Sequence, residues 1–129
     1  FWLGEWNVEQ NGTKIARSSI QLILDECVIF ENYEATGYSG KSLNMWDASE
    51  SRWEQHYTDT AGASTTFIGK LEDGKMVMLS DSVRNGATVT TRMTYSKEGP
   101  DRVRQLLETS LDGGKTWATS YDGMYVRRK

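Results

Sequence analysis

The chain has 129 residues, of which 37% are hydrophobic and 26% are charged, and its net charge is −3 at pH 7. This length predicts a single domain, residues 1–129, and the composition is typical of a soluble globular protein. An acidic chain without a basic stripe is a poor partner for nucleic acid, because neutralising phosphates supplies most of that affinity. The longest apolar runs, "CVIF" and "MVML", are four residues long and cannot span a membrane.

The single cysteine, Cys27, excludes a disulfide within the chain, so the fold must depend on its core. We expect a cytoplasmic protein, while leaving open that a signal peptide preceded Phe1. The oligomeric state also stays open, and a homo-oligomer is among the expectations.

No segment keeps the apolar i, i+3, i+4, i+7 spacing of a helix for ten residues, whereas short alternating stretches recur throughout, as in an all-β domain. In chain order we predict strands at 4–10, 15–23, 27–36, 41–47, 52–59, 63–70, 75–82, 87–96, 102–110 and 115–127. The dipeptides Asp73-Gly74, Asn85-Gly86 and Asp112-Gly113 tolerate the positive φ of tight hairpin turns. Pro100 falls in the turn "KEGPD", where a missing amide does no harm.

About ten strands with links this short must pair with their sequence neighbours, which predicts an up-and-down meander. A flat sheet of that size would leave long edges exposed, so we predict closure into a single antiparallel β-barrel with room for a cavity. A two-sheet sandwich is the alternative, although its crossovers need longer connections.

Regular hairpins would also set the cross-strand partners. An Arg92–Glu108 pair has two interpretations: an exposed pair worth under about 1 kcal/mol, or a charged pair inside the barrel. The expected partners are Arg92 with Glu108, Thr94 with Leu106, Met93 near Leu107, Asn44 with Gln55, and Trp46 with Trp53.

The segment "SLDGGKTW", residues 110–117, has the spacing S-x-D-x-G-x-T-W and resembles the Asp-box of sialidases and related β-propellers. A propeller would need several repeated blades, which this chain lacks. Asp112 can accept backbone amides across the turn while Trp117 packs beneath it. We therefore interpret the segment as a stable hairpin turn without catalytic meaning.

The opening "FWLGEWNV" contains Gly4-Glu5-Trp6, and this G-x-W at the start of a first strand resembles the calycin motif of lipocalins and fatty-acid-binding proteins. The resemblance implies that Trp6 closes one end of the barrel and that an arginine of the last strand packs across it. Arg127 is the better match, with Arg128 as the alternative. Such a cation–π contact is worth about 0.5–2 kcal/mol.

Further segments resemble one branch of lipocalin-like bacterial proteins, namely "LDECVIFENY", "GKSLNMWDASESRWEQHYTDTAG", "RMTY", "RVRQLLETSLDGGKTW" and "DGMYVRR". The resemblance implies a barrel and a pocket but no reaction. This chain departs from the pattern at Tyr57, where tryptophan is common, and at Glu26, where glycine is common. The first departure would alter the pocket, and the second would loosen a turn.

Strand "RWEQHYTD" separates by period two into an aromatic face and a charged face. Aromatic walls with a few convergent polar groups are typical of small-molecule sites. The alternative is a packed polar-aromatic core without a natural ligand. The side chains expected to line the lumen and to bind a ligand are Asn44, Trp46, Trp53, Gln55, Tyr57 and Asp59, joined by Arg92 and Glu108.

Glu31 is ambiguous. The family pattern makes it face inward, whereas an apolar quartet of Ile20, Leu22, Val28 and Phe30 would place it outside, unless a bulge intervenes. We include Glu31 in the candidate site. If it shares the lumen with Asp59 and Glu108, at least one of the three carboxyl groups should have a raised pKa.

No catalytic residue, metal site or cofactor is predicted. His56, the only histidine, falls on the charged face, away from Asp59, which disfavours a catalytic dyad of the two. Glu54 with His56 gives too few metal ligands. Haem binding through His56 is disfavoured by its outward direction. The leading hypothesis is a barrel that binds a small, partly apolar molecule. The alternatives are a small enzyme that uses a lumenal carboxylate for acid–base chemistry, and a protein-interaction module.

Overall fold

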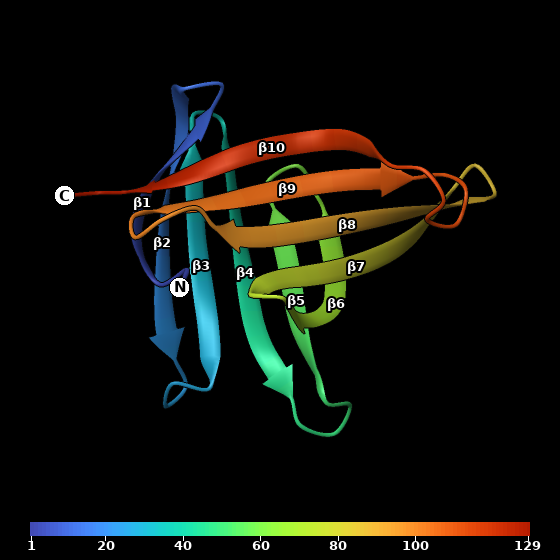
Figure 1. The fold of residues 1–129 in the computed structure, drawn as a ribbon, viewed down its shortest axis with the longest axis horizontal. Helices are drawn as coiled ribbons and strands as arrows, with labels where there is room; N and C mark the ends of the chain where they lie inside the picture. Colours follow the sequence, from blue (N-terminus) through green and yellow to red (C-terminus); the bar gives the residue numbers. More distant parts are fainter.

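The computed structural model describes all 129 residues and shows a closed antiparallel β-barrel of ten strands (Figure 1). Each strand pairs with its sequence neighbours, and the first strand pairs with the last. The predicted all-β, up-and-down barrel is therefore confirmed, and the sandwich alternative is wrong. No helix is present that could cross a membrane. The strands are β1 (Gly4–Gln10), β2 (Thr13–Ile23), β3 (Val28–Ala35), β4 (Tyr38–Asp47), β5 (Arg52–Asp59), β6 (Ser64–Glu72), β7 (Lys75–Arg84), β8 (Ala87–Lys97), β9 (Arg102–Ser110) and β10 (Ala118–Arg127).

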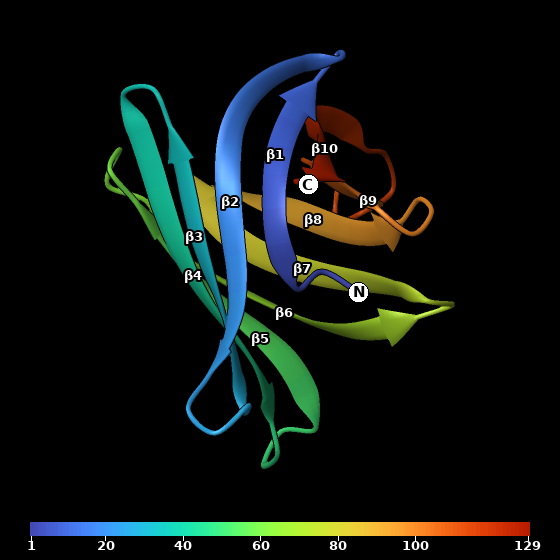
Figure 2. The same ribbon diagram turned by 90° about the vertical axis from the view of Figure 1, so that its left-hand side faces the viewer.

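The barrel is flattened into two layers. In Figure 1, β3 to β6 run up and down the view while β7 to β10 run across it, and Figure 2 shows these layers from the side of β1 and β2. This shape is consistent with a calycin-like fold.

The hairpin turns set the register as the sequence predicts. Asp73-Gly74 and Asn85-Gly86 both have positive φ at each residue, which is the backbone that two-residue hairpin turns require. The observed partners include Arg92 with Glu108, Met93 with Leu107, Thr94 with Leu106, Asn44 with Gln55, and Trp46 with Trp53.

The Asp-box segment is a hairpin turn between β9 and β10. The Asp112 carboxylate accepts hydrogen bonds from the backbone amides of Lys115 and Thr116, at 3.0 and 2.9 Å, and from the Thr116 hydroxyl at 2.6 Å. These bonds, led by the one from the Thr116 hydroxyl, lower the pKa of Asp112 to about 2. Because the turn uses these amides, β10 begins at Ala118 rather than at residue 115, where the sequence pattern places it.

The seam between β1 and β10 contains the closing contact. The Arg127 guanidinium lies 4.2 Å from the ring centre of the fully buried Trp6, its partner across the seam. Gly4 leaves room for this arginine, because a Cβ there would lie 2.3 Å from the guanidinium and the φ of +131° disfavours any other residue. Arg127 also donates to the Leu3 carbonyl at 3.1 Å.

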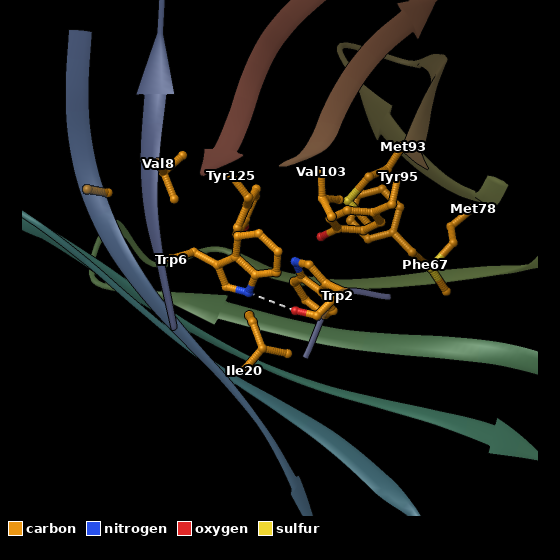
Figure 3. Packing of buried hydrophobic residues seen from close by; sticks show 11 residues of the cluster. Trp2, Trp6, Val8, Ile20, Phe67, Met78, Met93, Tyr95, Val103 and Tyr125 are labelled. Atoms are coloured by element: carbon orange, nitrogen blue, oxygen red, sulfur yellow. Dashed lines mark hydrogen bonds between the residues drawn. The ribbon is translucent and has the colours of Figure 1, made fainter. Parts of the chain in front are cut away.

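The core gathers around Trp6 and Trp2. The Trp6 indole N–H donates to the Trp2 carbonyl at 2.8 Å (Figure 3), and the Trp2 ring lies 4.8 Å from that of Tyr95 and 6.0 Å from that of Tyr125. Apolar side chains from β1, β2 and β6 to β9 complete this cluster, namely Val8, Ala16, Ile20, Phe67, Met78, Met93 and Val103. The core therefore fills the centre of the barrel and leaves space toward its ends.

Candidate functional site

The larger internal space is a cavity of about 470 Å³, within the range of small-molecule sites. It opens at the end of the barrel that carries the β3–β4, β5–β6 and β7–β8 turns, since residues beside these turns line it. Nine of its 17 lining residues are hydrophobic. The lining comprises Glu31, Tyr33, Tyr38, Gln55, Tyr57, Thr65, Phe67, Ser80, Ser82, Arg84, Thr91, Met93, Tyr95, Gln105, Leu107, Tyr121 and Tyr125.

All six tyrosines of the chain line this cavity. Two glycines make room for their rings. A Cβ at Gly123 would lie 2.4 Å from the Tyr121 hydroxyl, and a Cβ at Gly40 would lie 2.9 Å from that of Tyr57. Any larger residue at either glycine would therefore displace a ring of the wall.

Glu31 is the buried carboxyl group of this cavity, with 5% of its surface exposed. Its Oε2 accepts hydrogen bonds from the Ser18 hydroxyl at 2.8 Å and the Tyr125 hydroxyl at 2.7 Å, and its Oε1 accepts one from Ser42 at 3.3 Å. Burial raises the pKa of Glu31, and these hydroxyl groups oppose that shift only in part. The carboxyl group is thus a buried acid that neutral hydroxyls surround.

The register of β2 and β3 explains why Glu31 faces inward. Ile20 pairs with Glu31 and Gln21 pairs with Phe30, with no irregularity in the pairing of these two strands. The predicted apolar quartet is therefore wrong, because Phe30 stands one position out of phase with Ile20. No bulge is needed, and the inward direction that the family resemblance implies is the one observed.

A hydrogen-bonded network of three side-chain amides and the Tyr95 hydroxyl runs from Asn44 to Gln105 beside the cavity. The Gln55 amide donates to the Asn44 side-chain oxygen at 2.7 Å and to the Tyr95 hydroxyl at 3.4 Å. The Gln105 amide donates to the same hydroxyl at 3.0 Å. Tyr95 accepts both bonds, so its own proton stays available to a ligand. Asn44 and Gln55, both in the predicted site, are buried. Gln55 lines this cavity, whereas Asn44 does not.

Asp59 lies at the rim of the cavity. Its Oδ2 accepts hydrogen bonds from the hydroxyls of Tyr38 at 2.7 Å and Tyr57 at 2.8 Å, and its Oδ1 accepts the amides of Ala61 and Ala63. The bond from Tyr38 is the main cause of the lowered pKa of Asp59. Asp59 therefore orients two tyrosines of the wall and closes the β5–β6 turn.

Arg92 and Glu108 lie on the outer face, so the expectation that they orient a ligand in the lumen is wrong. Their neighbours Met93 and Leu107 line the cavity, and alternation along a strand sends Arg92 and Glu108 the other way. The Arg92 guanidinium donates to Glu108 at 3.1 Å and lies 4.0 Å from the Trp117 ring centre. The pair thus attaches the Asp-box turn to the outside of the barrel. Of the three carboxyl groups considered together, only Glu31 is enclosed.

Trp46 and Trp53 lie at the opposite end of the barrel. Trp46 is 47% exposed and lines neither cavity, which corrects its predicted lumenal position. Its ring centre lies 6.3 Å from that of Trp53, edge to face. Trp53 lines a second, smaller pocket of about 220 Å³. That pocket is lined by Phe1, Trp2, Leu3, Ile29, Asn44, Trp53, Met76, Met78 and Tyr95.

The structure offers no group of three or more His, Cys, Asp or Glu side chains that could hold a metal ion. The His56 side chain is 47% exposed, and its Nε2 lies 3.4 Å from Glu54 on the outer face of β5. No imidazole is therefore available inside the cavity as an acid, a base or a haem ligand.

Eight residues of the site were not predicted from the sequence. Tyr121, Gly123 and Tyr125 alternate on β10, and Glu31 and Tyr33 alternate on β3, so period two could have grouped them once one member was known to face inward. The missed residues are Ser18, Tyr33, Tyr38, Ser42, Tyr95, Gln105, Tyr121 and Tyr125.

Comparison with protein-family models gave no match for this chain, and comparison with curated proteins gave none either. The barrel supports the calycin-like architecture, and the finer likeness to lipocalins depends on the sequence motifs alone.

Proposed function

We propose that this protein is a lipocalin-like barrel that binds a small, partly apolar molecule in the tyrosine-lined cavity. The observation that supports it most is the cavity itself: about 470 Å³ of space, open at one end of the barrel, in which aromatic rings surround a few polar groups. The apolar share of the wall favours the body of the ligand. Glu31, Gln55 and the free Tyr95 proton would orient its polar end.

The test begins with protein purified under native conditions. Its mass is compared before and after denaturation, and any released compound is extracted and identified. A compound recovered reproducibly from the wild type, and lost from a Gly123→Leu variant whose new side chain displaces Tyr121, supports the proposal. A compound retained equally by both proteins would place binding elsewhere and count against this cavity.

A matched control uses the outer face. Thr119→Leu changes an exposed residue of the same strand, so it should keep the compound. Near-ultraviolet circular dichroism of all three proteins checks that the aromatic core is unchanged apart from Tyr121.

An acid–base enzyme is the second candidate, because burial raises the pKa of Glu31 inside a cavity that a substrate could enter. Any turnover found with the wild type should then disappear in Glu31→Gln, while near-ultraviolet circular dichroism shows the aromatic core unchanged. Equal turnover by both proteins would refute this candidate.

A further inference from the structure

The carboxyl group of Glu31 lacks a cationic partner. Its three hydrogen-bond partners are hydroxyl groups, and Arg84, exposed at the end of β7, is the only cationic residue in the lining. Arg84 forms no ion pair, and Asp59 at the rim is already bound to Tyr38 and Tyr57. The polar groups that face Glu31 or share its cavity are Ser18 from β2, Tyr33 from β3, Tyr38 and Ser42 from β4, Gln55 and Tyr57 from β5, Thr65 from β6, Ser80, Ser82 and Arg84 from β7, Thr91 and Tyr95 from β8, Gln105 from β9, and Tyr121 and Tyr125 from β10.

One oxygen of Glu31 retains capacity to accept. Oε2 has two short hydrogen bonds, whereas Oε1 has only the 3.3 Å bond from Ser42, and a carboxylate oxygen can accept two donors. Ser42 is itself held by the Asn44 amide at 2.9 Å. A ligand N–H placed near Oε1 could therefore donate the second hydrogen bond to this oxygen without displacing a protein group.

In its ionised state, Glu31 gives the cavity a negative potential that favours a cation. The charge of Glu31 contributes to the raised pKa values of Tyr33, Tyr38, Tyr95, Tyr121 and Tyr125, although burial is the larger cause for each. A negative potential that opposes phenolate formation also attracts a cation. Tyrosine rings add to this attraction, since their faces carry partial negative charge.

The hydrogen-bond network accommodates both protonation states of Glu31. In the ionised state, Tyr125 donates to Oε2 at 2.7 Å. In the neutral state, Glu31 can donate to the Tyr125 oxygen, while the phenol proton turns to the Gln105 side-chain oxygen at 3.3 Å. The carboxyl group can therefore be neutral in the empty cavity and ionised when a cation arrives.

We propose that the cavity binds an organic ammonium ion, whose nitrogen donates to Glu31 Oε1 and whose apolar body lies among the tyrosine rings. This inference rests on the proposed ligand-binding function and specifies its ligand class. Below the raised pKa of Glu31, binding releases one proton from the carboxyl group to the buffer. Affinity therefore rises with pH through that pKa and then levels off, because an alkylammonium group stays protonated well above neutral pH, as lysine does with a pKa of about 10.4.

The experiment compares three probes of similar shape and different charge: 2-phenylethylammonium, 2-phenylethanol and 3-phenylpropanoate. Titration calorimetry in two buffers with different ionisation enthalpies measures both affinity and proton release. We expect the ammonium probe to bind most tightly and with proton release. Glu31→Gln, which keeps the side-chain shape, should weaken that probe at least about tenfold and leave the alcohol unchanged.

Glu54→Gln on the outer face of β5 is the matched control and should bind all three probes as the wild type does. If the alcohol binds the wild type as tightly as the ammonium ion, or if proton release is absent at every pH, the ammonium inference is overturned while ligand binding stands. If none of the three probes binds up to its solubility limit, both the inference and the proposed function fail. The proton count uses the wild type alone, so it decides the question even if Glu31→Gln does not fold.

Discussion

Arg127→Met should loosen the barrel where β1 meets β10. Arg127 packs on the Trp6 ring at 4.2 Å, donates to the Leu3 carbonyl at 3.1 Å, and pairs with Asp101 at 3.1 Å. Methionine keeps the aliphatic stem and removes the guanidinium, so all three interactions are lost while most of the packing is kept.

The expected loss in the free energy of unfolding follows from these three interactions. The cation–π contact contributes about 0.5–2 kcal/mol. The charged hydrogen bond contributes about 1.5–3 kcal/mol in general, and the lower part of that range applies here because the Arg127 side chain is 33% exposed. The exposed pair with Asp101 adds about 0–1 kcal/mol. We therefore expect a loss of about 2–4 kcal/mol in the free energy of unfolding.

The assay is urea unfolding followed by tryptophan fluorescence, in which the midpoint should fall by roughly 1–2 M. Arg128→Met is the matched control, because Arg128 is exposed and its backbone amide, rather than its side chain, bonds to Glu5. That control should change stability by less than about 0.5 kcal/mol. Equal losses in the two variants, or an Arg127→Met loss within the range of the control, would refute the assignment of the closing contact to Arg127.

Three further changes test other parts of the fold. Between its ordinary pKa and its raised pKa, Glu31 binds more protons in the folded protein than in the unfolded chain, so stability falls as pH rises through this window. Glu31→Gln should remove that fall, with urea midpoints that match the wild type at low pH and exceed it above the window; identical pH profiles would contradict the buried acid. Gly69→Ala should lower the free energy of unfolding by more than about 3 kcal/mol or prevent folding, because its Cβ would lie 1.9 Å from the Val77 carbonyl oxygen. A loss under about 1 kcal/mol, measured by thermal unfolding, would show that β6 and β7 move apart at little energetic cost. Glu26→Gly should raise stability by about 0.5–1 kcal/mol, because Glu26 is exposed and has a φ of +66°, and a lower melting temperature would contradict this account.

The departure at Glu26 has a visible local consequence. Leu24, Asp25 and Glu26 all have positive φ, so the β2–β3 turn places three non-glycine residues in the left-handed region. The family resemblance implied only that this departure would loosen the turn. It could not show that the strain is shared among three residues, because that depends on how β2 and β3 are already paired.

The sequence by itself determined the strands, the hairpins and the closed barrel, because alternation, turn dipeptides and short links are local features that leave few topologies open. The same local information paired Asn44 with Gln55 and Arg92 with Glu108. Which face of each pair points inward is a different question. Only the closed sheet decided that Glu31 is buried and that Glu108 is outside, since the phase of each strand depends on its register with both neighbours.

The tertiary structure alone also gathered the tyrosines. They come from β3, β4, β5, β8 and β10, so no spacing along the chain connects them. Closure brings these strands around one space, and the glycines at 40 and 123 leave the volume that two of the rings occupy. Burial of Glu31 among them is a property of that enclosure, because a carboxyl group loses its water only when every surrounding strand is in place.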